Sequence, residues 1–147
     1  MRRFRFPLQA VLRLREHALG EAVRDLALAT KREAAVESKL DNVATGLRDC
    51  EDHGRGSGAT ALLARALESG LRRYRWRLLQ EKRKVDEAVE RARAAYLERR
   101  AAVSAMERLR EKSREDWRIS VESEERKEQD ELARLARAAV ERAEAES

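Results

Sequence analysis

A heptad repeat of apolar residues in the first third of the chain most narrowly limits the folds open to it. Apolar residues recur at alternating steps of four and three, which places them on one helical stripe that must pack against another helix. Six heptads follow one another, interrupted only by two charged residues. The two series are Leu12, Leu19, Leu26, Glu33, Leu40 and Leu47, and Leu8, Arg15, Ala22, Ala29, Val36 and Val43. The repeat predicts a coiled coil.

The composition favours helices throughout the 147 residues. Charged residues make up 41% of the chain, aromatic residues only 4%, and there is a single proline. Chains rich in Ala, Glu, Arg and Leu with this periodicity form long helices or coiled coils, and no run of β-branched and aromatic residues indicates a strand. We therefore expect an all-α fold, and the length suits a single domain over residues 1–147.

Two helices separated by a turn are expected. Pro7 suits the first turn of a helix, because its missing N–H would have no partner there, so the first helix is expected over residues 8–52. Three glycines within five residues then break the pattern and predict a turn over residues 53–60. Helical periodicity resumes beyond it, so the second helix is expected over residues 61–145.

The two helices should fold back as an antiparallel hairpin, because each carries an apolar stripe that must be buried. If Leu47 faces Leu71, Leu8 lies near residue 110 and about the last 35 residues have no partner helix. Of the 22 residues from 110 to 131, 15 are charged, so apolar residues become rare where pairing runs out. We expect a helical C-terminal overhang.

The chain offers few residues for chemistry. Its single cysteine, Cys50, and its second histidine, His53, provide half of the four ligands that a structural zinc ion takes. Nucleophilic catalysis needs a concave site that excludes water, which two paired helices do not form. We expect no enzymatic activity, no cofactor and no metal, and no apolar run approaches the length of a membrane span. A single cysteine suits a reducing cytosol.

Charge is unevenly distributed along the chain. Residues 54–109 carry 14 basic and 7 acidic side chains, whereas residues 110–147 carry 9 and 12. The densest basic run, residues 72–84, contains Tyr74 and Trp76, a combination that can bind phosphates and bases. Its arginines spread around a helix, however, so a solvated surface is the preferred interpretation. An acidic protein surface is the second interpretation, and nucleic acid or anionic lipid the third.

The N-terminal residues resemble the signature of the FliJ family, small coiled-coil proteins of the flagellar type III export apparatus. The similar segments are Phe4-Arg5-Phe6-Pro7-Leu8 and Val11-Leu12-Arg13-Leu14-Arg15-Glu16. The glycine-bearing turn and Lys84-Val85-Asp86 also match. Glu128-Gln129-Asp130-Glu131-Leu132-Ala133 is similar to the family's late Gln-x-x-Asp-Glu-x-Ala pattern, with the Gln one position before the Asp.

The resemblance implies a central stalk that inserts into the hexameric flagellar export ATPase, promotes its assembly and activity, and links it to the export gate protein in the membrane. Export chaperones are a further class of partner, and the place implied is the cytoplasm at the inner face of the cell membrane. The implied ATPase-binding residues are Leu8, Leu12, Arg15, Asp130 and Glu131. The implied gate-binding residues are Val43, Leu63, Leu67 and Tyr74, to which we add Leu47 because it shares that face.

Other interpretations stay open at this point. Leu8 and Leu12 are also heptad core positions, and Asp130 and Glu131 are also explained as solvated acids. Family members often carry an aromatic residue near the end of the first helix, where this chain has small side chains. The equivalent stalk of a non-flagellar type III secretion system is the nearest alternative function. A self-associating coiled-coil scaffold is the second alternative, and it predicts a stable dimer instead of a monomeric hairpin.

Overall fold

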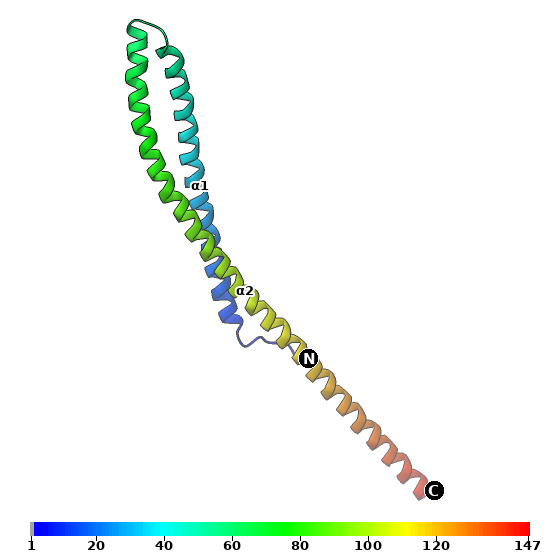
Figure 1. Cartoon of the computed structure of the whole chain (residues 1–147). Coiled ribbons are helices and arrows are strands. Elements are labelled where there is room, and N and C mark those ends of the chain that lie inside the picture. Colours follow the sequence, from blue (N-terminus) through cyan, green and yellow to red (C-terminus); the bar gives the residue numbers. More distant parts are fainter. Residues whose placement is uncertain (1) are drawn as a thin grey trace. The chain divides into compact units, whose positions relative to one another are not determined.

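The computed structural model describes residues 2–147, which form two helices and no strand (Figure 1). Helix α1 runs from Gln9 to Gly54 and contains 46 residues. Helix α2 runs from Ala59 to Glu146 and contains 88 residues. The expected all-α class is confirmed. The chain divides into two compact units, the hairpin unit (residues 15–101) and the terminal unit (residues 2–14 with 102–147).

The connection between the helices is shorter than the sequence pattern predicts. Gly58 has a φ of 95°, in the left-handed region that glycine adopts without a steric penalty. The Leu62 N–H donates to the Gly58 carbonyl at 3.2 Å, which closes the first turn of α2. A guanidinium nitrogen of Arg65 donates to the Gly54 carbonyl at 3.4 Å. Because both helix ends find these partners, the helices extend to residues 54 and 59.

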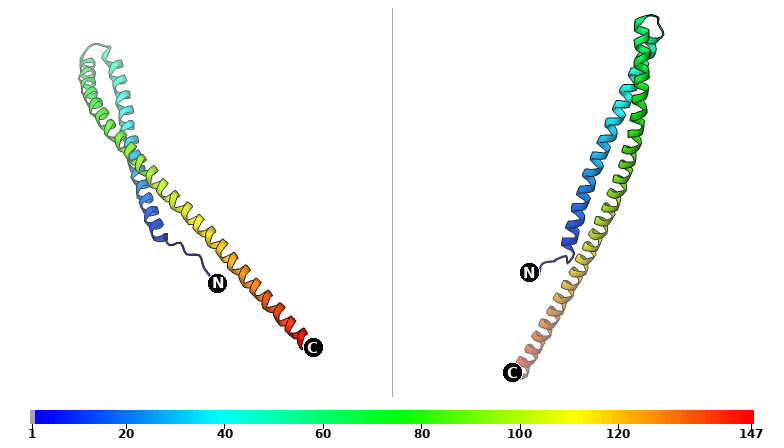
Figure 2. Two further views of the ribbon diagram at one scale, coloured as in Figure 1. Left: turned by 60° about the horizontal axis from the view of Figure 1, so that its bottom comes forward. Right: turned by 90° about the vertical axis from the view of Figure 1, so that its left-hand side faces the viewer.

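Within the hairpin unit, α1 and α2 pack along a seam of small apolar side chains. Both views of Figure 2 show α1 and the green part of α2 side by side. Every heptad position from Leu19 to Leu47 is buried or half-buried, as the repeat predicts. The exception in this unit is Arg15, which is exposed. The most deeply buried side chains are Ala22, Val36, Val43 and Cys50 on α1 and Ala61, Ala64, Leu78 and Val89 on α2.

Gly46 fixes how closely the helices approach near the loop. A Cβ atom added to Gly46 would lie 3.2 Å from the Leu71 Cδ1 atom, which is closer than an ordinary contact. The missing side chain therefore lets Leu71 pack against the backbone of α1. The sequence pattern predicts Leu47 opposite Leu71, whereas the residue in contact with Leu71 is Gly46, one position earlier.

Glu33 interrupts the seam with a charged layer. Its side chain is half-buried, and the Lys82 ammonium on α2 lies 2.8 Å from an Asp86 oxygen and 3.9 Å from a Glu37 oxygen. Loss of hydration and the nearby Asp86 carboxyl raise the pKa of Glu33. The hydrogen bond from Lys82 lowers the pKa of Asp86. One ammonium group therefore neutralises only part of the charge on three carboxylates.

The terminal unit joins the two ends of the chain. Residues 2–6 are not helical and follow α2, so that the ring of Phe4 lies 5.9 Å from the ring of Trp117. The Arg2 guanidinium forms an ion pair with Glu124. Three apolar side chains are buried in this unit: Leu12, Val103 and Met106. An aromatic contact and an ion pair thus extend the packing beyond the start of α1.

The last part of α2 lacks a packing partner among the described residues. From residue 125 to 146 every side chain is exposed except Ala138, which is half-exposed. We call residues 125–146 the tail. A helical overhang is present as expected, but it is shorter than about 35 residues because Phe4 contacts Trp117 and Arg2 pairs with Glu124. No helix within residues 2–147 contains an apolar stretch long enough to cross a membrane.

We expect Glu33→Gln to raise the melting temperature at neutral pH, because it removes a carboxylate held beside Asp86 and Glu37. The pKa of Glu33 is raised in the folded chain, so its protonation favours folding. The advantage of the variant should therefore shrink as the pH falls toward the ordinary value of 4.5. Circular-dichroism melting at neutral pH and near pH 4.5 measures the rise in melting temperature and its decrease with falling pH.

The matched control is Glu16→Gln, an exposed position on the same helix. It should leave the melting temperature unchanged at either pH. A lower melting temperature for Glu33→Gln at neutral pH would contradict the account of this layer.

Candidate functional site

The candidate sites are surfaces for binding other proteins. Within residues 2–147, no group of three His, Cys, Asp or Glu side chains is placed to hold a metal ion. Cys50 is buried, and the Nδ1 atom of His53 lies 2.7 Å from the Asp49 carbonyl oxygen of its own helix. These two residues therefore serve the packing and the end of α1. The exposed apolar and charged residues are the features left to explain.

The tail carries an acidic pair followed by an apolar stripe. Asp130 and Glu131 are exposed, as their proposed role requires. Leu132 and Leu135 come directly after them and are 66% and 67% exposed. The sequence prediction named only the acids, although the spacing of the leucines was the signal for a stripe of this kind. Acidic and apolar groups thus lie together on one bare helix.

The other residues predicted to bind the ATPase lie in different surroundings. Leu8 is 43% exposed, whereas Leu12 is completely buried and is not accessible to a partner in this structure. Arg15 is exposed and belongs to the hairpin unit. Gln9 and Arg110 line one hollow, so the start of α1 lies beside that part of α2. Asp130 follows twenty residues later, about 30 Å along a helix, so the structure does not join Leu8 and Asp130 in one cluster.

An apolar hollow lies near the loop of the hairpin unit, between the two helices. Leu63 and Leu67 line it and are 72% and 60% exposed. Leu71 lies in its wall beside Gly46, where an aromatic side chain would need the space that Leu71 fills. We call it the tip hollow. Its full lining is Gly46, Asp49, Cys50, His53, Thr60, Leu63, Ala64, Leu67 and Leu71.

The remaining residues predicted to bind the gate lie outside the tip hollow. Val43 is buried in the seam, where it holds the two helices together. Tyr74 is exposed, and Leu47 is half-buried in a second hollow that shares no residue with the first. The structure therefore brings together Leu63 and Leu67 but not the whole predicted set.

The basic run is spread around α2, as its sequence spacing predicts. Arg73 and Arg77 are exposed and lie outside the lining of both the tip hollow and the second hollow, whereas Arg72 and Arg75 line the second hollow together with Trp76. Arg72 also forms an ion pair with Glu68 at 2.6 Å. The arginines therefore divide into two pairs with different surroundings.

Comparison with known protein families matches residues 4–142 to the family described as Flagellar FliJ protein. The match covers nearly the whole chain and confirms the resemblance seen in the N-terminal and late motifs. No curated protein and no solved structure matches the chain.

We expect Leu12→Ala to lower the free energy of unfolding of the terminal unit by about 2–5 kcal/mol, because truncating a fully buried leucine leaves a cavity. Trp117 lies in the same unit, so its fluorescence during urea unfolding reports the loss. The measurement is made in a Trp76→Phe background, which leaves one indole.

Leu8→Ala is the control, since Leu8 is 43% exposed. It should lower the free energy of unfolding by less than about 1 kcal/mol. An equally mild effect at both positions would show that Leu12 is not a core residue.

Proposed function

The chain belongs to the FliJ family of flagellar export proteins, and we propose that it acts as a stalk that promotes the export ATPase and links it to the export gate. The family consists of non-enzymatic components of flagellar type III export. The single observation that carries the finer proposal is the tail, a helix that leaves acidic and apolar residues uncovered.

The tail is the proposed ATPase-binding element. Leu132 and Leu135 are each about two-thirds exposed, and fully burying a leucine contributes about 1.5–3 kcal/mol. A partner that covers this stripe therefore gains binding energy that the isolated chain does not use. Glu131 lies one turn before Leu135 on the same face and would set the orientation against basic groups of the partner. Asp130 lies on the other side of the helix and is a further proposed contact.

The residues at the start of the chain have a supporting role in this proposal. Leu8 and Arg15 are exposed and remain proposed contacts of the ATPase. Leu12 would act from the core of the terminal unit, in which Val103 and Met106 are also buried. Its truncation should weaken binding only through the stability of the terminal unit.

The tip hollow is the proposed binding site for the gate protein. Leu63 and Leu67 present large apolar surfaces to solvent on one side of the hairpin unit. An apolar side chain from the gate would fill the space between them, with Tyr74 and Leu47 as outlying contacts. Val43 would contribute by holding α1 and α2 at the spacing that forms the hollow. These contacts would place the protein in the cytoplasm at the base of the flagellum, where export chaperones are further candidate partners.

The proposal is tested by titrating the matching export ATPase with the purified chain and measuring ATP hydrolysis. We expect stimulation that saturates at about one chain per ATPase hexamer. Asp130→Lys with Glu131→Lys should raise the concentration needed for stimulation by about tenfold, because the contact loses its charge complementarity. Leu63→Asp with Leu67→Asp should keep the stimulation and lose binding to the immobilised cytoplasmic domain of the gate protein.

The tail variant and the tip-hollow variant control for each other, because each should lose binding to one partner and keep binding to the other. Glu141→Lys with Glu144→Lys makes the same charge change further along the exposed tail and should retain stimulation. Absence of binding and stimulation by a chain shown to be folded would contradict the stalk proposal. Loss of both partners in both variants would contradict the division into two sites.

A further inference from the structure

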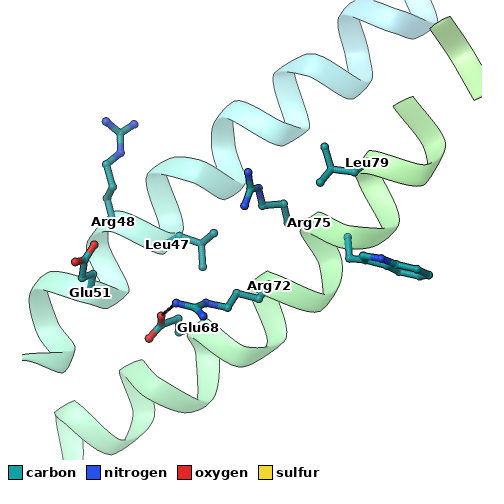
Figure 3. A pocket seen from close by; sticks show the side chains of 8 residues that line it. Leu47, Arg48, Glu51, Glu68, Arg72, Arg75 and Leu79 are labelled. Carbon is teal, nitrogen blue, oxygen red and sulfur yellow. Dashed lines mark hydrogen bonds and ion pairs between the residues drawn. The ribbon is translucent and has the colours of Figure 1, made fainter. Parts of the chain in front are cut away.

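The second hollow of the hairpin unit is a groove that combines exposed apolar and cationic side chains. Trp76 is 63% exposed and Leu79 is 40% exposed, although both are large apolar residues. Figure 3 shows Leu47 on α1 and Leu79 on α2, with Arg72 and Arg75 reaching out from α2. We call it the Trp76 groove. Its lining is Leu47, Arg48, Glu51, Glu68, Arg72, Arg75, Trp76 and Leu79.

The charged groups of the groove are only partly paired within the chain. Arg72 is paired with Glu68 at 2.6 Å, but 71% of its side chain remains exposed. Arg75 forms no ion pair with a described residue. Tryptophan and arginine, with tyrosine, are enriched among the residues that contribute most of the binding energy at protein interfaces. The groove therefore has the composition of a binding site for an acidic protein segment with apolar anchors.

The tail of α2 repeats the pattern of the groove with the opposite charge. In the groove, Arg72 and Arg75 are followed by two apolar residues at steps of i, i+3, i+4 and i+7. In the tail, the same four steps are occupied by two acids and two leucines. Residues at this spacing share one helix face. The corresponding positions are Arg72 and Glu128, Arg75 and Glu131, Trp76 and Leu132, and Leu79 and Leu135.

We propose that the tail of one copy of this chain docks in the Trp76 groove of a second copy. The two helices run parallel, so that each acid meets an arginine and each leucine meets Trp76 or Leu79. Both patterns belong to one continuous helix, α2, so they meet within a single chain only if that helix breaks. The occupant is therefore the tail of another copy.

The side chains needed for the contact are all accessible. Glu128 and Glu131 are exposed, and Leu132 and Leu135 are 66% and 67% exposed. The charge pairs lie at the surface, where salt screens them. Self-association should therefore be reversible, grow with protein concentration and weaken with added salt.

A nucleic acid fits the groove less well. Phosphates offer nothing apolar to cover Leu47 and Leu79, which line the groove beside the arginines. The tail supplies both the negative charges and the leucines at matching steps.

Docking would cover Glu131 and Leu132, which belong to the surface proposed for the ATPase. This consequence rests on the proposed function: the ATPase and the groove of a second copy would compete for the tail, so binding of the ATPase would dissociate the self-associated form. The association itself is a property of the purified chain and is measured without the ATPase.

The test is sedimentation velocity of the full chain over a range of concentrations at low salt. The wild type should associate, and Arg72→Glu with Arg75→Glu should raise the dissociation constant at least about tenfold, because attraction becomes repulsion. The matched control is Arg73→Glu with Arg77→Glu, which makes the same charge change at exposed neighbours outside the groove. The control should change the constant far less. Circular dichroism verifies that each variant is folded.

A charge exchange between the groove and the tail makes the test specific. Glu128→Arg with Glu131→Arg should also prevent self-association, because each tail repels the groove of another copy. Combined in one chain with Arg72→Glu and Arg75→Glu, it should restore self-association, since every reversed groove then meets a reversed tail. A direct contact between these four positions predicts this rescue, whereas a net-charge effect does not.

Three results would overturn the inference. The first is a wild-type chain that stays monomeric at every concentration at low salt. The second is an equal rise in the dissociation constant for the groove variant and its control, which would show that the effect depends only on net charge. The third is a groove that binds duplex DNA through Arg72 and Arg75 while the chain remains monomeric. Failure of the stalk proposal would be separate, since the groove variant retains the tail and should still stimulate the ATPase.

Discussion

The unequal length of the two helices is the constraint on which the rest of the structure depends. Helix α1 has 46 residues and α2 has 88, so α1 can cover at most about half of α2. The covered part buries its apolar stripe within the chain. The remainder must either be polar or keep its apolar residues for another molecule. The tail, residues 125–146, is mostly charged, yet it retains Leu132 and Leu135. Packing within the chain does not explain why these two exposed positions are leucines.

The seam that pairs the helices is built from small side chains and one charged layer. Alanine and valine bury little area each, so the hairpin gains its stability from many modest contacts. The layer around Glu33 and Lys82 adds little or no stability, but it restricts alignment. A shift by one heptad in one direction would bring Val89 to the place of Lys82 and leave Glu33 and Glu37 without a cation, which is a known way for polar residues to restrict the register of a coiled coil. A shift in the other direction would bring Arg75 there and is restricted less by this layer. Gly46, against which Leu71 packs, restricts the alignment further.

The heptad pattern predicted the core well and the ends poorly. Ala22, Val36 and Val43 are buried as the repeat requires, because periodicity alone determines which face of a helix is apolar. At the start of the chain Leu12 is buried as the repeat predicts, whereas Leu8 and Arg15 stand at heptad positions and are exposed. Leu8 precedes the first residue of α1, and Arg15 has a long charged side chain that can reach solvent from a heptad position. The contact of Phe4 with Trp117 could not be predicted, because the two residues are far apart in the sequence and Phe4 precedes the helical repeat. Leu63 and Leu67 were predicted as binding residues from the family resemblance, and the structure shows that they line the same hollow.

Hydrogen–deuterium exchange of the chain alone and with the export ATPase tests the central claim most directly, because it reports on the tail itself. At concentrations where the chain is monomeric, amides of residues 125–146 should exchange faster than those of the seam, since uncovered helices open more readily. Adding the ATPase should slow exchange in the tail and leave the seam unchanged. A tail that is already protected in the isolated monomer, or that gains no protection from the ATPase, would contradict the account.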